Sequence, residues 1–166
     1  AKEALAAIDG QIMLTDGIAQ AYQSGMSRMA QVASVRTVLS TTCAGRTATP
    51  FLFATTAQDF LKNHDLAEEV FGPLGLVVVA DSQEEVPDIA KSLQGQLTCT
   101  VHMDDADTDD AAAMMPILER KAGRVLANGF PTGVEVSEAM VHGGPYPAST
   151  NFGATSVGTM SIRRFL

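Results

Sequence analysis

The spacing of apolar residues near the start of the chain predicts an amphipathic helix. The polar pair Thr15 and Asp16 comes first, and apolar residues then recur at roughly helical spacing: Ile18, Ala21, Tyr22 and Met29. Threonine and aspartate are common where helices begin, because their side chains satisfy free backbone N–H groups. We therefore expect a helix that begins after these two residues and stops before the β-branched residues at 35–38.

Two strands and a short helix are predicted next. The β-branched stretch at 35–38 and the apolar stretch at 51–55 are typical of strands. Between them, residues 41–50 contain the glycine, threonine and proline residues of a loop. We expect a short helix at 57–62, directly after the second strand.

The clearest strand signal is the apolar run at 74–80. Its β-rich part, residues 76–80, is typical of strands that are buried on both faces of a sheet. Ser82 and Glu85 have the spacing of a capping box, which predicts a helix start. Apolar residues then follow a helical stripe: Val86, Ile89, Ala90 and Leu93. Gly95 is a natural end for this helix.

Two further strands with a helix between them complete the pattern. Residues 97–101 and 124–128 are predicted strands, and residues 109–121 form a predicted helix that ends at Gly123. Strands that alternate with helices at this spacing form parallel crossovers. The sequence therefore predicts an α/β fold, with a mostly parallel sheet flanked by helices, in a single domain over residues 1–166.

Composition narrows the classes of partner. The chain has 11 Lys and Arg against 19 Asp and Glu, a net charge of −8, which argues against binding to nucleic acid or to an anionic membrane surface. Its two cysteines have no disulfide or zinc spacing, so we expect a reducing, cytoplasmic location. Small molecules and proteins remain as partners. The final stretch, residues 129–158, is rich in Gly, Pro, Ser and Thr and predicts long loops around a short helix at 134–140.

Several residues that could carry chemistry have a simpler explanation. Cys43 has no His or carboxylate tied to it in sequence, and burial in a strand would keep Cys99 a protonated thiol. The acidic run at 104–110 begins with calcium-loop spacing but lacks the obligatory Gly and the closing Glu, so we interpret it as a solvated turn at a helix start. The glycines Gly153 and Gly158 lack the Lys of a phosphate-binding loop. The sequence predicts no metal site, because the three histidines show no paired ligand spacing.

The segment at 68–73, Glu-Glu-Val-Phe-Gly-Pro, carries the most informative chemistry. A carboxylate at Glu69, just before a strand, can accept two hydrogen bonds from a ribose diol. Phe71, two residues later, points the same way in an extended chain and offers an apolar wall to a flat ring. The pair suits a nucleoside.

This hexapeptide resembles the Glu-Glu-Ile-Phe-Gly-Pro signature of the aldehyde dehydrogenase superfamily. The residues at 122–129, Ala-Gly-Arg-Val-Leu-Ala-Asn-Gly, resemble the Ala-Gly-x-Val-x-Val-Asn of that family. The resemblance covers most of the chain. It implies that the chain is the C-terminal part of a catalytic domain, that NAD or NADP is the cofactor, and that Glu69 holds the nicotinamide ribose while Phe71 packs beside its ring.

Within the superfamily, the stretches at 128–136 and 139–147 look like the branch that oxidises α-ketoglutarate semialdehyde. The usual family tail is altered here, because His142 precedes a glycine pair and Tyr146 and Pro147 occupy the region of the usual Lys. This departure favours a polar substrate. The resemblance implies that Phe130 and His142 lie in the substrate pocket.

The resemblance also implies what the chain does not contain. The family's cofactor-binding domain, general-base Glu and nucleophilic Cys precede this region, so no residue of this chain is expected to be catalytic and the chain alone is expected to be inactive. The parent enzyme is expected to be a homo-oligomer. The absence of an initiator Met and a helical pattern already under way at Ala4, Leu5 and Ile8 lead us to expect an excised portion of a longer polypeptide.

An alternative from another class is a free-standing acidic α/β binding or receiver-like signalling module. Asp81, at the end of the strand at 76–80, would then accept a phosphoryl group or bind a cation. Such a site needs a partner acidic pair and a Lys at neighbouring strand ends, whereas Lys62, Lys91 and Lys121 fall in helical patterns.

Overall fold

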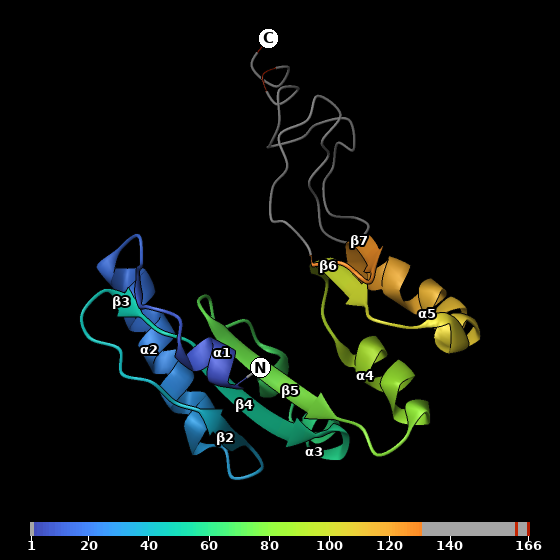
Figure 1. Cartoon of the computed structure of the whole chain (residues 1–166), viewed down its shortest axis with the longest axis horizontal. Coiled ribbons are helices and arrows are strands. Elements are labelled where there is room, and N and C mark those ends of the chain that lie inside the picture. The colour runs from blue at the N-terminus through green and yellow to red at the C-terminus, as the bar shows by residue number, and fades with distance from the viewer. Residues whose placement is uncertain (1, 131–161, 163–165) are drawn as a thin grey trace. The chain divides into compact units, whose positions relative to one another are not determined.

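The computed structural model describes residues 2–130 together with residues 162 and 166 (Figure 1). The chain divides into two compact units, Ala1–Ile89 and Ala90–Leu166, and each is described by itself. The described residues of the first unit form these elements in order: α1 (Lys2–Ala6), β1 (Gln11–Ile12), α2 (Asp16–Gln31), β2 (Arg36–Leu39), β3 (Thr47–Ala48), β4 (Phe51–Thr56), α3 (Ala57–Lys62), the 3₁₀ helix η1 (His64–Ala67), β5 (Leu74–Val79) and the 3₁₀ helix η2 (Gln83–Glu85).

The main sheet of the first unit has the order β2-β4-β5. β4 and β5 lie side by side and run parallel, from the pair Phe51 and Leu74 to the pair Thr56 and Val79, and α3 lies on the connection between them (Figure 1). β2 pairs with β4 in the antiparallel direction, and the short strands β1 and β3 form a separate antiparallel pair. The α/β fold is thus confirmed, with a mixed sheet in place of a mostly parallel one in this unit.

Aromatic residues fill the core of the first unit. Phe51, Phe53 and Phe60 are at most 5% exposed, and Tyr22 is 1% exposed. The rings of Phe51 and Phe53 stack, and Tyr22 meets Phe51 edge-on with ring centroids 6.4 Å apart. Full burial of a large apolar side chain contributes about 1.5–3 kcal/mol, so these rings tie α2 to the start of β4.

The predicted first helix is confirmed as α2. Thr15 is its N-cap, with the hydroxyl accepting a hydrogen bond from the Ile18 N–H at 3.2 Å. The buried face differs in part from the prediction, because Ala21 is exposed. The face toward the core is made by residues that follow one side of the helix: Ala19, Tyr22, Gly25 and Met29.

The second unit contains a parallel crossover. β6 (Gln96–Val101) pairs in parallel with β7 (Ala122–Ala127), and the 3₁₀ helix η3 (Asp105–Asp107) and helix α5 (Thr108–Lys121) connect them. This confirms the predicted strand, helix and strand. Helix α4 (Val86–Ser92) precedes them and spans the division between the two units.

Two local predictions were wrong. Residues 76–80 were expected to be buried on both faces, but Val77 and Val79 are 45% and 53% exposed, because neighbouring residues cover only one side of β5. The capping box at Ser82 does not form. The Ser82 side chain makes no capping bond, and the Glu85 carboxylate accepts instead from the backbone N–H of Asp81 at 2.8 Å.

Three further predictions concern the loop at 41–50, the helix at 134–140 and the number of domains. The predicted loop at 41–50 contains the two-residue strand β3. The predicted helix at 134–140 lies outside the described residues, and the single domain over 1–166 stays a prediction. In the described part of the chain, no helix is long and apolar enough to cross a membrane.

Candidate functional site

The candidate cofactor segment, residues 68–73, connects η1 to β5 and rests on α2. Val70 packs against Gly25 in the middle of that helix. A Cβ atom added at Gly25 would lie 2.7 Å from Val70 Cγ1, so the glycine is what allows the segment to approach the helix so closely. The predicted hexapeptide is therefore a held segment and not a free surface turn.

Gly72 makes a second close contact with α2. Its φ of +147° lies in the region that side-chain-bearing residues rarely adopt. A Cβ atom at this position would overlap the ring of Tyr22. The Gly72 carbonyl also accepts a hydrogen bond from the Leu74 N–H at 2.8 Å, which closes a tight turn at the entry to β5. Glycine is thus required here by conformation and by space.

The hydroxyl of Tyr22 joins the beginnings of the two strands. It lies 2.8 Å from the Thr49 carbonyl and 3.3 Å from the Pro73 carbonyl, and it donates toward both. The Pro73 carbonyl also accepts from the Phe51 N–H at 2.9 Å. Burial, and secondarily the charge of Cys43, raise the pKa of Tyr22 to about 12, so the phenol keeps the proton that these acceptors need.

Glu69 and Phe71 lie on the same held segment, and both are exposed. Phe71 is 66% exposed. Among residues 2–130, no hydrogen bond or ion pair engages the Glu69 carboxylate, whereas the adjacent Glu68 lies 3.7 Å from Arg28 in an exposed pair. Exposed pairs of this kind contribute about 0–1 kcal/mol, so Glu69 is the carboxylate left for a ligand.

Of the two predicted substrate-pocket residues, Phe130 lies in the described part of the chain. Phe130 is 87% exposed, and its ring centroid lies 5.3 Å from that of His102. His142 falls outside the described residues. Their role in a substrate pocket stays a prediction.

The two cysteines have different surroundings. The Cys43 sulfur lies 3.3 Å from the Thr49 hydroxyl and accepts from the Thr49 N–H at 3.4 Å, on the same residue whose carbonyl binds Tyr22. Burial raises the pKa of the Cys99 thiol in β6, as expected for a packing residue. Both are free thiols, and the contacts of Cys43 with Thr49 join two parts of the loop at 41–50.

The acidic run near 104–110 caps a helix, as predicted. The Asp104 side chain accepts from the Ala106 N–H, and the Asp107 carboxylate accepts from the Asp104 N–H, a capping box at the start of η3. Asp109 and Asp110 then occupy the first turn of α5, where negative charge favours the helix dipole. In the described part of the chain, no cluster of three or more His, Cys, Asp or Glu residues could hold a metal ion.

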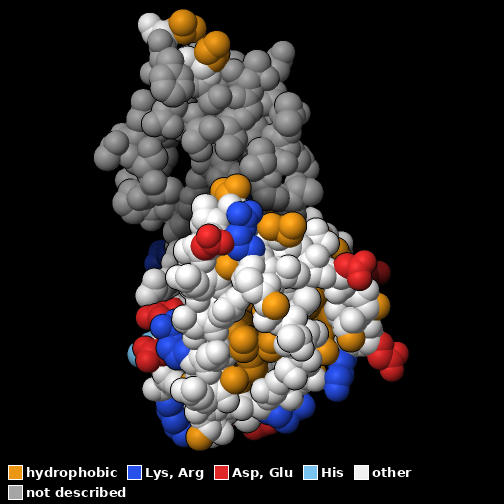
Figure 2. Space-filling view, turned by 90° about the vertical axis from the view of Figure 1, so that its left-hand side faces the viewer, with side chains coloured by type: hydrophobic (Ala, Val, Ile, Leu, Met, Phe, Trp, Pro, Cys, Tyr) orange, Lys and Arg blue, Asp and Glu red, His pale blue; other side chains and the backbone are white. Residues whose placement is uncertain are grey.

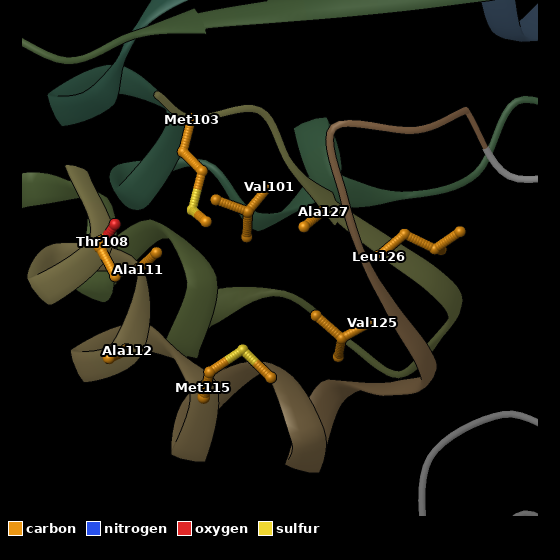
Figure 3. A pocket seen from close by; sticks show the side chains of 9 residues that line it. All are labelled: Val101, Met103, Thr108, Ala111, Ala112, Met115, Val125, Leu126 and Ala127. Atoms are coloured by element: carbon orange, nitrogen blue, oxygen red, sulfur yellow. The ribbon is translucent and has the colours of Figure 1, made fainter. Parts of the chain in front are cut away.

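The second unit holds an apolar pocket of about 280 Å³ between α5 and the strands β6 and β7. Figure 3 shows the side chains of Val101, Met103, Ala111 and Met115 directed toward a common space. Thr108 supplies the one hydroxyl among the lining residues. A pocket this apolar has no charged group to orient a cofactor or an oxo-acid.

Apolar side chains are also exposed in the first unit. Ile12 and Leu14 are 75% and 81% exposed, and a groove of about 230 Å³ runs beside Ile12, Ala48 and Pro73. Figure 2 shows hydrophobic side chains gathered on one face among charged ones. Single exposed apolar residues are normal on protein surfaces, so this face alone assigns no function.

Asp81, the centre of the signalling alternative, is exposed and follows β5 directly. Its backbone N–H binds Glu85, and no observation on the described residues favours a phosphate or cation site there. The alternative therefore stays an untested prediction.

Two residues that hold the candidate segment, Tyr22 and Gly25, are not predicted as site residues from the sequence. Tyr22 was interpreted as one apolar position of a helix, and Gly25 was not singled out. The sequence offers one signal for Gly25, its place inside a predicted helix. Glycine there is unfavourable by about 1 kcal/mol relative to alanine, so a close packing contact is expected.

Comparison with known proteins gives a consistent result. No protein-family model matches the chain. The chain is 46% identical, over 100% of its length, to alpha-ketoglutaric semialdehyde dehydrogenase 2 of Azospirillum brasilense, and it spans 32% of that protein. The chain thus spans about a third of the length of the curated relatives that it matches.

Solved structures show the same fold. An NAD-dependent benzaldehyde dehydrogenase from Corynebacterium glutamicum matches with a TM-score of 0.62 at 21% identity, over 77% of this chain and 28% of that one. An NADP-dependent glyceraldehyde-3-phosphate dehydrogenase from Bacillus halodurans, in complex with NADP, matches with a TM-score of 0.65 at 15% identity, over 86% of this chain and 30% of that one. The predicted resemblance to aldehyde dehydrogenases is confirmed.

Proposed function

We propose that this chain is the C-terminal part of the catalytic domain of an NAD(P)-dependent aldehyde dehydrogenase that oxidises α-ketoglutarate semialdehyde to α-ketoglutarate. The observation that carries the proposal is the 46% identity to a named α-ketoglutaric semialdehyde dehydrogenase over the whole chain, which includes residues 68–73. The geometry agrees, because the structure holds that segment on a helix and leaves a carboxylate and an aromatic ring exposed on it.

The residues of this segment fit a nicotinamide nucleoside. The Glu69 carboxylate offers two oxygens to a ribose diol, and the exposed Phe71 ring offers a flat apolar surface. The nicotinamide, when bound, accepts the hydride from the substrate. Glu69 and Phe71 orient the acceptor and exclude water from one side of it, which is positioning and not covalent chemistry.

The covalent chemistry belongs to residues outside this chain. In the proposed enzyme a cysteine attacks the aldehyde carbon, hydride leaves the resulting tetrahedral adduct, and a glutamate activates water to hydrolyse the thioester. This chain contributes Phe130 and His142 to the substrate pocket. The proposed enzyme is a cytoplasmic homo-oligomer that binds neither nucleic acid nor membrane.

The substrate assignment is tested on the full-length polypeptide that carries this chain. We expect the kcat/KM for α-ketoglutarate semialdehyde to exceed that for an uncharged aldehyde of similar length, with NAD and NADP each assayed. His142→Ala is expected to narrow the difference, because it removes a polar group from the pocket. Equal efficiency on both aldehydes would remove the substrate assignment and leave a general aldehyde dehydrogenase. No aldehyde-dependent reduction of either nucleotide would overturn the proposed function.

A further inference from the structure

We propose that helix α2 positions the cofactor segment through Tyr22 and Gly25, so that these two buried residues set the placement of Glu69 and Phe71 without touching the cofactor. The inference rests on the proposed function and assigns a further pair of positioning residues to it. Both residues lie on the buried face of α2, three positions apart and therefore on one side of the helix.

The first contact fixes the middle of the segment. Val70 lies directly between Glu69 and Phe71, and its methyl groups rest where a side chain at Gly25 would otherwise be. A Cβ at Gly25 would be 2.7 Å from one methyl carbon and 3.0 Å from the other. The first distance is shorter than real Cβ contacts and the second is at the tight limit, so Val70 must shift to admit a side chain at Gly25, and we expect its exposed neighbours to shift with it.

The second contact fixes the end of the segment. The Tyr22 ring lies against Gly72, and its hydroxyl donates toward the carbonyls of Thr49 and Pro73. Those carbonyls lie beside the first residues of β4 and β5, because Phe51 pairs with Leu74. Tyr22 therefore ties the exit of the segment to both strands of the parallel pair.

Together the two contacts flank Phe71 on either side. The entry to the segment is anchored as well, since Leu66 in η1 is 4% exposed. A segment held at its entry, middle and exit has little freedom to reorient its exposed side chains. Helix α2 thus acts on cofactor binding through the segment. Its buried residues Tyr22 and Gly25 must both pack in the core and hold the segment in place.

Glycine-to-alanine changes at two positions of α2 separate positioning from helix stability. Gly25→Ala should raise the KM for NAD or NADP about fivefold or more in the full-length polypeptide, with a smaller change in kcat, because overpacking displaces Val70. Gly17→Ala is the matched control. A Cβ at Gly17 would meet only the Thr15 hydroxyl, at 3.9 Å, so both KM and kcat should stay at wild-type values. Equal cofactor KM values in the two variants would overturn the inference.

Two further variants test the contacts themselves. The double variant Gly25→Ala/Val70→Ala removes the methyl groups that clash and should recover most of the cofactor KM lost by Gly25→Ala. Tyr22→Phe keeps the ring and loses the hydroxyl, so it should raise the cofactor KM about twofold to tenfold. Failure of the double variant to recover, together with an unchanged KM in Tyr22→Phe, would contradict the proposed contacts.

Hydrogen exchange separates this inference from the proposed function. Amide exchange in residues 68–74 should be faster in Gly25→Ala than in Gly17→Ala, whether or not the protein oxidises an aldehyde. If the wild type reduces neither nucleotide but exchange differs as expected, the proposed function fails and the positioning by α2 stands. If the wild type is active and exchange at 68–74 is the same in both variants, the positioning fails and the function stands.

Discussion

At the scale of single residues, the neighbouring carboxylates Glu68 and Glu69 differ in whether they have a partner within the described residues. Glu68 lies near Arg28 in an exposed pair, whereas Glu69 is exposed with its carboxylate unengaged within residues 2–130. The sequence letters are identical, so only the placement of the segment on α2 distinguishes the two. We therefore expect nucleotide binding to weaken when the carboxylate of Glu69 is removed.

We expect Glu69→Gln to reduce hydride-transfer efficiency about 10- to 150-fold in the full-length polypeptide. The reason is the loss of a charge-assisted hydrogen bond, which is worth about 1.5–3 kcal/mol. Phe71→Ala should weaken binding of the nicotinamide half of the cofactor. Acylation of the catalytic thiol should persist in both variants, which a thiol-labelling or burst assay checks. Unchanged kinetics would show that the segment is only a surface turn, and Glu68→Gln is the matched control, with kinetics expected near the wild type.

Tyr22 gives the protein a predictable alkaline limit. Its pKa of about 12, against the ordinary value of 10.0, means that the folded state holds the phenol proton more tightly than the unfolded state does. This contribution to stability is complete below pH 10 and is lost as the pH rises through the folded pKa.

The measurement is a comparison of wild type with Tyr22→Phe. The free energy of unfolding should fall more steeply for the wild type between pH 10 and 12. The tyrosinate absorbance that disappears in the variant should titrate near the upper end of that interval. A missing component that titrates at an ordinary tyrosine pKa would contradict the burial of Tyr22 in solution.

At the scale of elements, the sequence predicted the main helices and strands because their signals are local. Thr15 caps α2, residues 57–62 form α3 and the apolar run at 74–80 contains β5. The errors arose where the outcome depends on distant residues. Whether Val77 is covered depends on what packs against β5, and whether Ser82 caps a helix depends on where the Glu85 side chain finds a donor.

The candidate site divides in the same way. Glu69 and Phe71 could be named as candidates from the sequence, because residue type, spacing and the family resemblance act within six consecutive positions, and their role stays a prediction. Tyr22 and Gly25 could not, because their role depends on a contact between α2 and a segment more than forty positions later, a separation that no local pattern reports. His142 could be predicted as a candidate only from the resemblance, and it lies outside the described residues.

Two glycines with positive φ allow a prediction for the entry to β5. Gly45 has a φ of +56°, with no atom near the position of a Cβ, so Gly45→Ala should lower the free energy of unfolding by about 1–2 kcal/mol through backbone strain alone. Gly72→Ala adds overlap with Tyr22 to its strain and should lower it by about 3 kcal/mol or more. Urea unfolding of both variants checks the order. Equal losses would show that the Tyr22 ring yields to a side chain at Gly72.

At the scale of the whole molecule, the chain is short relative to its relatives, and we propose that it positions the cofactor while other parts of the enzyme carry out the covalent chemistry. The chain matches the Azospirillum protein over 100% of its own length and a second protein, from Acinetobacter baylyi, over 94%, and yet it spans 32% and 30% of these proteins. The described residues include the segment at 68–73, which we propose binds one half of a nicotinamide nucleotide. A carboxylate and a ring orient a cofactor, but they do not supply a nucleophile or a base for water.

The 166-residue chain by itself is therefore expected to show no aldehyde dehydrogenase activity. Neither of its cysteines is placed for the reaction: Cys43 is bound to Thr49 within a loop, and the pKa of Cys99 is raised by burial. Purified chain is incubated with α-ketoglutarate semialdehyde and NAD or NADP, and reduced nucleotide is followed by absorbance, with the full-length polypeptide as the positive control. Cys43→Ser and Cys99→Ser identify the source of any signal. Nucleotide reduction above background that disappears in either variant would show that the chain carries its own nucleophile, and the assignment of the covalent chemistry to residues outside it would then be wrong.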